Sequence, residues 1–99
     1  MVALPHAVSA ALERVPTWSS GGPAHFLTGL EPGRAGLLAL MDLAVALRAE
    51  PEIVARARPL EGRTFAGMFF DPSLRTRASM AVACTRLGAG FLELVPGSD

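Results

Sequence analysis

Residues 63–95 read RTFAGMFFDPSLRTRASMAVACTRLGAGFLELV, and this stretch decides the fold. The apolar run 63–70 lacks clean alternation, which predicts a strand that is covered on both faces. Residues 74–87 predict a helix, which the glycines of 88–90 end. Residues 91–95 form a second apolar run. Strand, helix and strand in this order and length predict a parallel βαβ unit.

Further helices are predicted ahead of this unit. Residues 5–15 predict a short helix, residues 31–49 a long helix that is apolar nearly all round, and residues 51–58 another short helix. The apolarity of the long helix indicates burial on more than one side. Residues 17–23 predict a loop in which Trp18 is half-covered by its own chain. Cover of an apolar patch or contact with a partner subunit is the alternative for Trp18. We therefore expect an extension and linker at 1–23 and the body of the domain at 24–99.

The predicted class is α/β, with leading helices and one βαβ unit. Only two strands are predicted, whereas sheets typically hold about 4–6. We therefore expect an incomplete doubly wound parallel sheet from a longer protein. Stabilisation of the short sheet by association is the alternative.

Composition narrows the functional classes. The chain has 99 residues, is 51% hydrophobic and carries nine basic and nine acidic residues, so its net charge is zero. A neutral chain gives no support to a nucleic-acid partner. Cys84 is the single cysteine, which excludes an internal disulfide, and its mid-helix place predicts a small buried side chain. No apolar run reaches the roughly 18 residues of a membrane span, and residues 1–23 lack the basic start and long apolar region typical of a signal peptide, so we expect a cytoplasmic protein.

Polar and basic residues gather where the first strand turns into the helix: Ser73, Arg75, Thr76 and Arg77. The first N–H groups of a helix have no acceptor within it and favour an anion. Arginine binds phosphate oxygens in bidentate fashion. Two arginines at the positive end of a helix are unfavourable unless an anion compensates them. The pattern therefore indicates a phosphate-bearing ligand.

Simpler roles exist for the same residues. Ser73 can cap the helix with its hydroxyl, and Thr76 can bond back to a carbonyl of its own helix. Arg75 and Arg77 diverge by about half a turn, so one can face the ligand while the other faces a carboxylate or solvent. His6 and His25 lack neighbours at metal-ligand spacing. Glu61 and Glu93 show no pairing that indicates acid–base catalysis.

Residues 70–77, Phe-Asp-Pro-Ser-Leu-Arg-Thr-Arg, with Ala78-Ser79-Met80 and the later Arg86-Leu87-Gly88-Ala89, resemble the carbamoyl-phosphate signature of the aspartate/ornithine carbamoyltransferase family. The form Asp-Pro-Ser-Leu is most similar to the N-acetylornithine or N-succinylornithine branch. Residues 25–30 resemble the opening strand and turn of the family. The resemblance covers residues 24–97.

The resemblance implies the N-terminal part of a carbamoyl-phosphate-binding domain. Ser73, Leu74 through its backbone, Arg75 and Thr76 would bind carbamoyl phosphate, and Arg77 would be structural. Arg75 and Thr76 would also be catalytic, in transfer of the carbamoyl group to the amine of N-acetylornithine or ornithine in arginine biosynthesis. The resemblance implies a homotrimer and no metal or organic cofactor. The neutral charge and the lack of a long apolar run add the expectations of no nucleic-acid partner and no membrane.

The chain also departs from the family pattern. Ala81 stands where the family has a glutamate, which removes an expected partner of Arg77. The family's His-Pro-x-Gln element and second domain are not found in these residues, so we expect this chain alone to be catalytically incomplete. A truncated, non-catalytic phosphate-binding α/β fragment and an unrelated anion-binding module are the alternatives.

Overall fold

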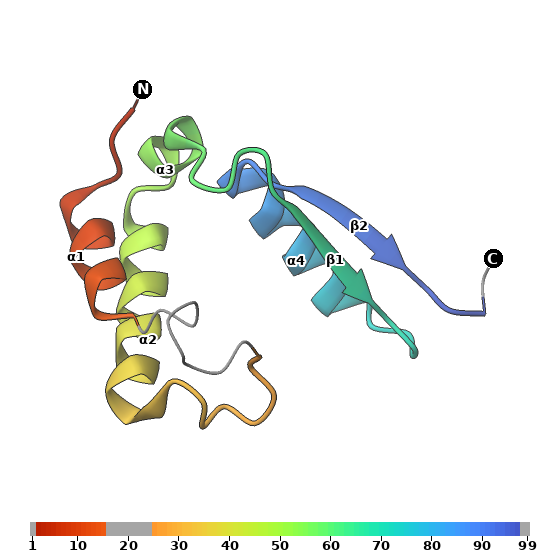
Figure 1. The fold of residues 1–99 in the computed structure, drawn as a ribbon. Helices are drawn as coiled ribbons and strands as arrows, with labels where there is room; N and C mark the ends of the chain where they lie inside the picture. Colours follow the sequence, from red (N-terminus) through yellow and green to blue (C-terminus); the bar gives the residue numbers. More distant parts are fainter. Residues whose placement is uncertain (1, 16–24, 98–99) are drawn as a thin grey trace. The chain divides into compact units, whose positions relative to one another are not determined.

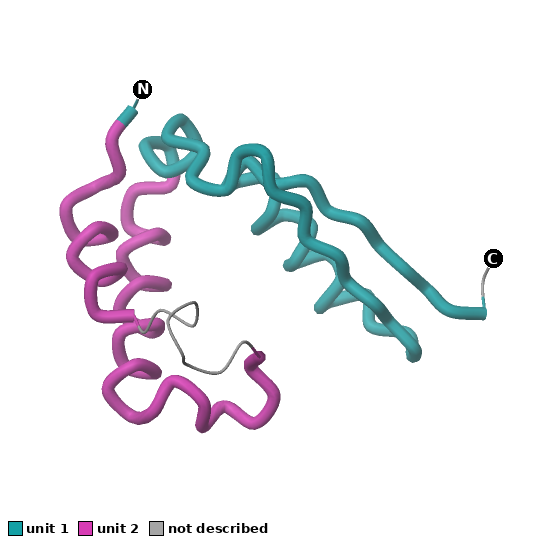
Figure 2. The backbone as a smooth tube through the Cα atoms, in the orientation of Figure 1, with its two compact units in different colours: residues 1–2, 52–99 teal, residues 3–51 magenta. Residues whose placement is uncertain are grey.

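The computed structural model describes residues 2–15 and 25–97. Within them the elements follow in the order α1 (His6–Arg14), α2 (Gly33–Ala49), α3 (Pro51–Ala57), β1 (Thr64–Met68), α4 (Leu74–Leu87) and β2 (Gly90–Leu94) (Figure 1). They divide into two compact units, residues 3–51 and residues 52–99 with residues 1–2 (Figure 2). The loop predicted at 17–23, with Trp18, lies outside the described residues. None of the helices described is long and apolar enough to cross a bilayer.

Helices α1 and α2 pack against each other in the first unit. Val8 and Ala11 of α1 are buried. The buried residues of α2 are small and follow helical spacing: Gly36, Ala39 and Ala46. Short side chains let two helices approach closely, so this contact follows from the composition of both stripes. Both helices begin and end within two residues of the predicted limits, which confirms them.

The predicted burial of α2 on more than one side is wrong. Several of its large apolar side chains are exposed: Leu37, Leu38, Met41 and Val45. Within its unit, α1 covers one stripe of α2 and leaves these side chains outside the contact. Hydrophobicity in a sequence shows which side chains favour burial, but not whether another segment reaches them.

The second unit contains the predicted βαβ arrangement. Strands β1 and β2 are parallel, with Thr64 opposite Gly90 and Met68 opposite Leu94. Helix α4 connects them with the limits that the sequence predicts, and α3 precedes β1. Strand β1 is shorter than the predicted 63–70, and β2 begins one residue before the predicted 91–95. The α/β class and the parallel connection are therefore confirmed.

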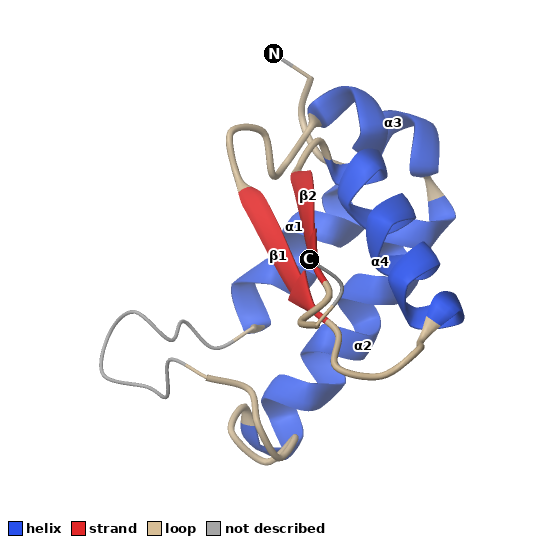
Figure 3. Cartoon of the chain, turned by 90° about the vertical axis from the view of Figure 1, so that its right-hand side faces the viewer, coloured by secondary structure: helices blue, strands red, loops and turns tan. Residues whose placement is uncertain are grey.

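Helix α4 lies along one side of the strand pair (Figure 3). The residues of α4 that are covered form one stripe at helical spacing: Arg77, Met80, Ala81, Cys84 and Leu87. Cys84 is buried, as predicted. The spacing of three and four residues places this stripe on a single face of the helix, so the rest of α4 faces outward.

The prediction that the strands are covered on both faces is wrong for this unit. Met68 is 57% exposed and Leu92 is 51% exposed. Phe65 and Phe91 are direct cross-strand partners, and their rings stack with centroids 6.1 Å apart. Side chains alternate between the faces of a strand, so Phe65 and Phe91 share one face while Met68 and Leu92 share the other. A single helix covers only one of these faces.

The opening strand that the family resemblance implies within residues 25–30 is not formed. These residues make a series of bends ahead of α2. The carboxylate of Glu31 accepts hydrogen bonds from the backbone N–H groups of Leu27, Thr28 and Gly29 at 2.8 to 3.2 Å. Because these N–H groups converge on one side chain, they are not available for a strand ladder.

Candidate functional site

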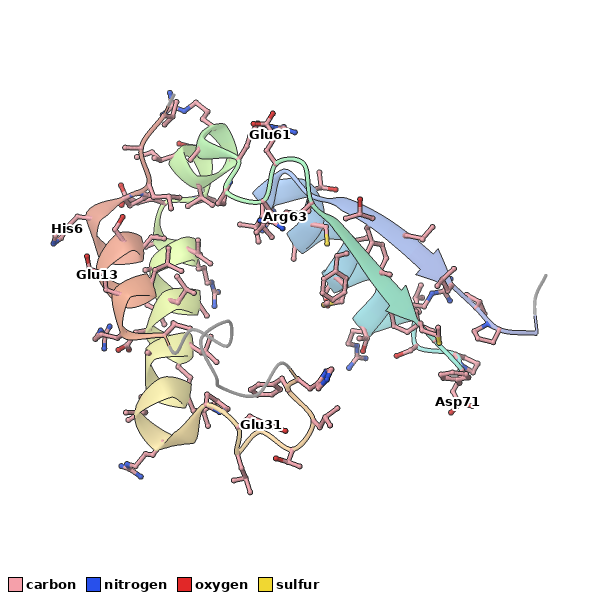
Figure 4. All side chains as sticks on the ribbon, viewed as in Figure 1. His6, Glu13, Glu31, Glu61, Arg63 and Asp71 are labelled. Atoms are coloured by element: carbon pink, nitrogen blue, oxygen red, sulfur yellow. The ribbon has the colours of Figure 1, made fainter. Side chains whose placement is uncertain are left out.

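The candidate site lies where β1 passes into α4. The N–H of Phe69 donates to the carbonyl of Leu94 at 2.8 Å, which extends the strand pairing one step beyond β1. The chain then turns at Asp71, and Figure 4 shows this residue at the opposite end of β1 from Glu61 and Arg63. Parallel α/β proteins bind ligands at the carboxyl ends of their strands, which is the end occupied by this turn.

Ser73 occupies the N-cap position of α4, but its side chain makes no capping hydrogen bond. Its carbonyl accepts the N–H of Arg77 at 2.9 Å, which closes the first turn. The N–H groups of Leu74, Arg75 and Thr76 precede that bond and have no acceptor within the helix. The hydroxyl of Ser73 and three backbone donors are therefore available at one helix end within the described part of the chain.

Arg75 and Thr76 face outward from this turn. Both are exposed, and in the described residues neither side chain has a hydrogen-bond or ion-pair partner. The simpler role considered for Thr76, a bond from its hydroxyl to a helical carbonyl, is not formed. Thr85 near the other end of α4 does make such a bond, to the carbonyl of Ala81 at 3.0 Å. The side chain of Leu74 is 78% exposed and has no polar atom, so this residue can offer a ligand only its backbone N–H as a donor.

Arg77 behaves differently from Arg75. It lies on the covered stripe of α4, and its Nε contacts the carboxylate of Glu93 on β2. This Nε atom is buried, and the contact is an ion pair by proximity instead of an aligned hydrogen bond. The sequence reasoning allowed one of the two arginines to face a carboxylate, and this is the arrangement found.

Glu93 is the residue at this site that the sequence reasoning missed. The sequence shows no second carboxylate beside it, but the signal for a cationic partner is present: a single charge in the middle of the apolar run 91–95. A charge there requires a partner, and Arg77 is the charged residue on the stripe of α4 that faces the strands.

In the described residues Arg75 takes part in no ion pair. The first turn of α4 contains no acidic residue. Glu93 offsets the charge of Arg77, whereas the guanidinium of Arg75 adds to the positive end of the helix macrodipole. An exposed guanidinium, a free hydroxyl and unpaired N–H groups are suited to a phosphate dianion.

The far end of α4 is fixed by backbone bonds. Gly88 has a positive φ of 84°, and its N–H bonds to the carbonyl of Thr85 while Ala89 bonds to Cys84 at 2.8 Å. The N–H of Leu60 also donates to the carbonyl of Leu87 at 2.9 Å. These contacts hold the C-terminal end of α4 beside the start of β1. They therefore help to fix the position of the first turn of α4, at the opposite end of the helix.

The other candidate residues do not join this turn. His6 and His25 are exposed. Glu61 forms an exposed ion pair with Arg58 at 3.4 Å. Among the described residues, no three histidine, cysteine, aspartate or glutamate side chains converge.

Comparison with known proteins identifies residues 24–98 with the family model described as aspartate/ornithine carbamoyltransferase, carbamoyl-P binding domain. An ornithine carbamoyltransferase of Cenarchaeum symbiosum is 39% identical over 71 residues, which cover 72% of this chain and 23% of the relative. An aspartate carbamoyltransferase catalytic subunit of Synechococcus sp. is 40% identical over 82 residues, which cover 81% of this chain and 24% of the relative. An ornithine carbamoyltransferase of Bradyrhizobium diazoefficiens is 41% identical over 69 residues, which cover 70% of this chain and 22% of the relative.

The chain thus spans about a quarter of the length of these relatives. No solved structure matches it. The family match includes the whole βαβ unit and the turn at Ser73–Thr76. The chain belongs to the aspartate/ornithine carbamoyltransferase family, and its residues 24–98 match the carbamoyl-phosphate-binding domain of that family.

Proposed function

We propose that this chain is the carbamoyl-phosphate-binding segment of a carbamoyltransferase. The hydroxyl of Ser73, the N–H of Leu74 and the guanidinium of Arg75 bind the phosphate group. Thr76 donates its hydroxyl to the carbonyl oxygen of the ligand. The observation that carries the proposal is that Arg75 has no carboxylate partner in the described residues, while Arg77, two residues along, is paired with Glu93.

The proposed reaction is acyl transfer. The nitrogen of an amine attacks the carbonyl carbon, a tetrahedral intermediate forms, and the C–O bond to phosphate breaks with its electron pair leaving on phosphate. Arg75 offsets the charge on the departing phosphate. Thr76 stabilises the negative charge that develops on the carbonyl oxygen. We assign the acceptor amine and its proton transfer to parts of the relatives that this chain does not match.

The acceptor is proposed to be ornithine or N-acetylornithine, which places the reaction in arginine biosynthesis. The ornithine-type relatives and the Asp-Pro-Ser-Leu form of residues 71–74 support this choice. Relatives named as aspartate carbamoyltransferase catalytic subunits match equally well, so aspartate is the competing acceptor. The homotrimer and the cytoplasmic setting remain predictions. So does the boundary at residues 23 and 24, although α1 and α2 share one compact unit across it.

The proposal is tested by titrating the 99-residue chain with carbamoyl phosphate in a calorimeter. Arg75→Ala should weaken binding at least about tenfold, because it removes a charge-assisted bidentate contact. Arg86→Ala removes the same charge from the last turn of the same helix and should leave the affinity within about twofold. Equal affinities for the two variants would contradict the assignment.

A non-catalytic phosphate-binding segment is the second candidate function. The outward-facing donors at Ser73–Thr76 support binding of any phosphate, whereas no residue for an acceptor amine is identified among the described residues. Radiolabelled carbamoyl phosphate with ornithine, N-acetylornithine and aspartate distinguishes the two functions. Formation of a carbamoylated amine by the protein that carries this segment supports the enzyme, and binding without turnover supports the second candidate.

A further inference from the structure

Arg77 is the one arginine of the candidate turn that points toward the strands. Its side chain is 35% exposed and that of Glu93 is 36% exposed, so the pair is half-buried between α4 and β2. The backbone of Arg77 closes the first turn by donating its N–H to the carbonyl of Ser73 at 2.9 Å. One residue therefore links the first turn of α4, on which the phosphate donors lie, to the second strand.

Helix α4 contains no acidic residue that could pair with Arg77 in place of Glu93. A partner within the helix would stand three or four residues from Arg77. Those places are held by Ser73 and Leu74 before it and by Met80 and Ala81 after it. Ala81 lies on the same covered stripe as Arg77, so a longer acidic side chain there would meet the guanidinium. In this chain the counter-charge comes from the strand instead.

We propose that Glu93 is a positioning residue for the phosphate site. It holds the guanidinium of Arg77 against β2, and through the backbone of Arg77 it fixes the first turn of α4 at the carboxyl ends of the strands. The N–H groups and Arg75 are thereby presented to the anion, while Arg77 is kept away from it. This inference rests on the proposed function and extends it to a residue outside the turn itself.

A purely electrostatic role for Glu93 predicts the opposite result. Removal of a negative charge near the turn raises the local positive potential and should tighten anion binding. Removal of a positioning contact leaves Arg77 unpaired and the first turn less ordered, which should weaken binding. The sign of the change in affinity therefore separates the two roles.

The experiment measures binding of inorganic phosphate and carbamoyl phosphate by the 99-residue chain and its variants. Glu93→Gln should weaken binding of both ligands about three- to tenfold, the size expected when contacting residues are coupled. Glu61→Gln is the matched control, because it makes the same change in net charge at the opposite end of β1, and it should leave the affinity unchanged.

A rescue variant tests whether pairing of Arg77 is the cause. Glu93→Gln combined with Ala81→Glu supplies a carboxylate from within the helix, four residues from Arg77. It should restore affinity to within about twofold of the parent. Urea denaturation of every variant shows that each is folded under the binding conditions. If Glu93→Gln alone does not fold, the comparison of the rescue variant with the parent decides the matter.

Arg75→Ala is measured in the same series. If it leaves affinity unchanged, the proposed phosphate site itself is wrong. If Arg75→Ala weakens binding while Glu93→Gln leaves it unchanged or tightens it, the site stands and the positioning role of Glu93 is overturned. A rescue variant that folds but still binds about tenfold more weakly than the parent would also overturn it.

Discussion

At the scale of single residues, Arg75 and Arg77 show how two identical side chains acquire different roles. Two positions apart on α4, they fall on different faces of the helix. Arg77 lies on the covered stripe and meets Glu93, whereas Arg75 is exposed beside unpaired backbone donors. Both residues are arginines, so their different surroundings follow from their positions on the helix and not from their chemistry.

Thr76 should discriminate between carbamoyl phosphate and inorganic phosphate. Thr76→Val removes a hydroxyl that has no partner in the described residues, so we expect carbamoyl phosphate to bind about three- to tenfold more weakly. Phosphate, which lacks the carbonyl oxygen, should bind within about twofold of its original affinity. Competition titrations with both ligands measure this difference.

Thr85→Val is the control for that substitution. It removes a hydroxyl of the same helix that already donates to the carbonyl of Ala81 at 3.0 Å. Its effect should be small and equal for both ligands. An equal loss of both ligands in Thr76→Val would place the hydroxyl on the phosphate instead of the carbonyl.

Glu31 should remain ionised to low pH. Hydrogen bonds from the backbone N–H of Leu27, its own N–H and Thr28 lower the pKa of Glu31 from 4.5 to about 2. Because the pKa is lowered in the folded chain, this contribution to stability is present above pH 4.5 and is lost as the pH falls through about 2. The amide resonances of residues 27–29 should therefore shift with a midpoint near pH 2, as followed by NMR.

The variant Glu31→Gln checks the assignment of that transition. It keeps the shape of the side chain but has no titrating carboxyl group, so the transition near pH 2 should be absent from the amides of residues 27–29. A midpoint close to 4.5 in the parent protein would show that these hydrogen bonds do not hold the carboxylate in solution.

At the scale of elements, the sequence predicts the helices better than their surroundings. The limits of α4 follow from Pro72 before it and Gly88 after it, both of which are local signals. The failure at residues 25–30 has a physical cause. The family resemblance implies a strand there, but the carboxylate of Glu31 accepts the N–H groups of Leu27 and Gly29. A single side-chain contact of this kind produces no periodic pattern of apolar residues, so the sequence does not reveal it.

The part of the candidate site that depends on local sequence could also be predicted. Ser73, Arg75 and Thr76 lie within four residues, and a helix start brings them together without any distant contact. Glu93 is sixteen residues from Arg77, and its place beside that residue depends on how α4 packs on the strands. Tertiary pairing of this kind is not encoded by local spacing.

The C-terminal end of α4 should be sensitive to substitution of Gly88. An added Cβ would lie 3.0 Å from Cβ of Arg58 and 3.3 Å from its Cα, at a backbone φ of +84°. We therefore expect Gly88→Ala to lower the free energy of unfolding by about 1–3 kcal/mol, measured by urea denaturation.

Gly62→Ala separates the two causes of that loss. Gly62 has a similar φ of +81°, but an added Cβ would meet no atom within 4 Å. It should cost only the backbone strain, about 1 kcal/mol. Equal losses for both variants would indicate that the close approach to Arg58 is unimportant.

At the scale of the whole molecule, the core is made of small side chains. The buried hydrophobic residues among those described are Val8, Ala11, Ala39, Ala46, Val54 and Cys84. Many larger apolar side chains are exposed, including Met68 and Leu92 on the sheet. Stability rises with the apolar area removed from water, so these exposed apolar side chains contribute little to the free energy of unfolding.

We therefore expect low stability for the 99-residue chain. Its free energy of unfolding should fall below about 5 kcal/mol, the lower limit of the usual range for folded domains. Urea denaturation followed by circular dichroism measures this value, with and without carbamoyl phosphate. A value above about 10 kcal/mol would contradict the small core described above.

The contact between Arg77 and Glu93 also has a consequence for how the two strands find each other during folding. A slip of β2 by one residue along β1 would turn every side chain of β2 to the opposite face. Leu92 or Leu94 would then stand opposite Arg77, and the half-buried cation would lose its carboxylate. Apolar residues on both faces of β2 discriminate poorly between these alignments. The single charge in the strand therefore penalises the incorrect alignments and marks the correct one.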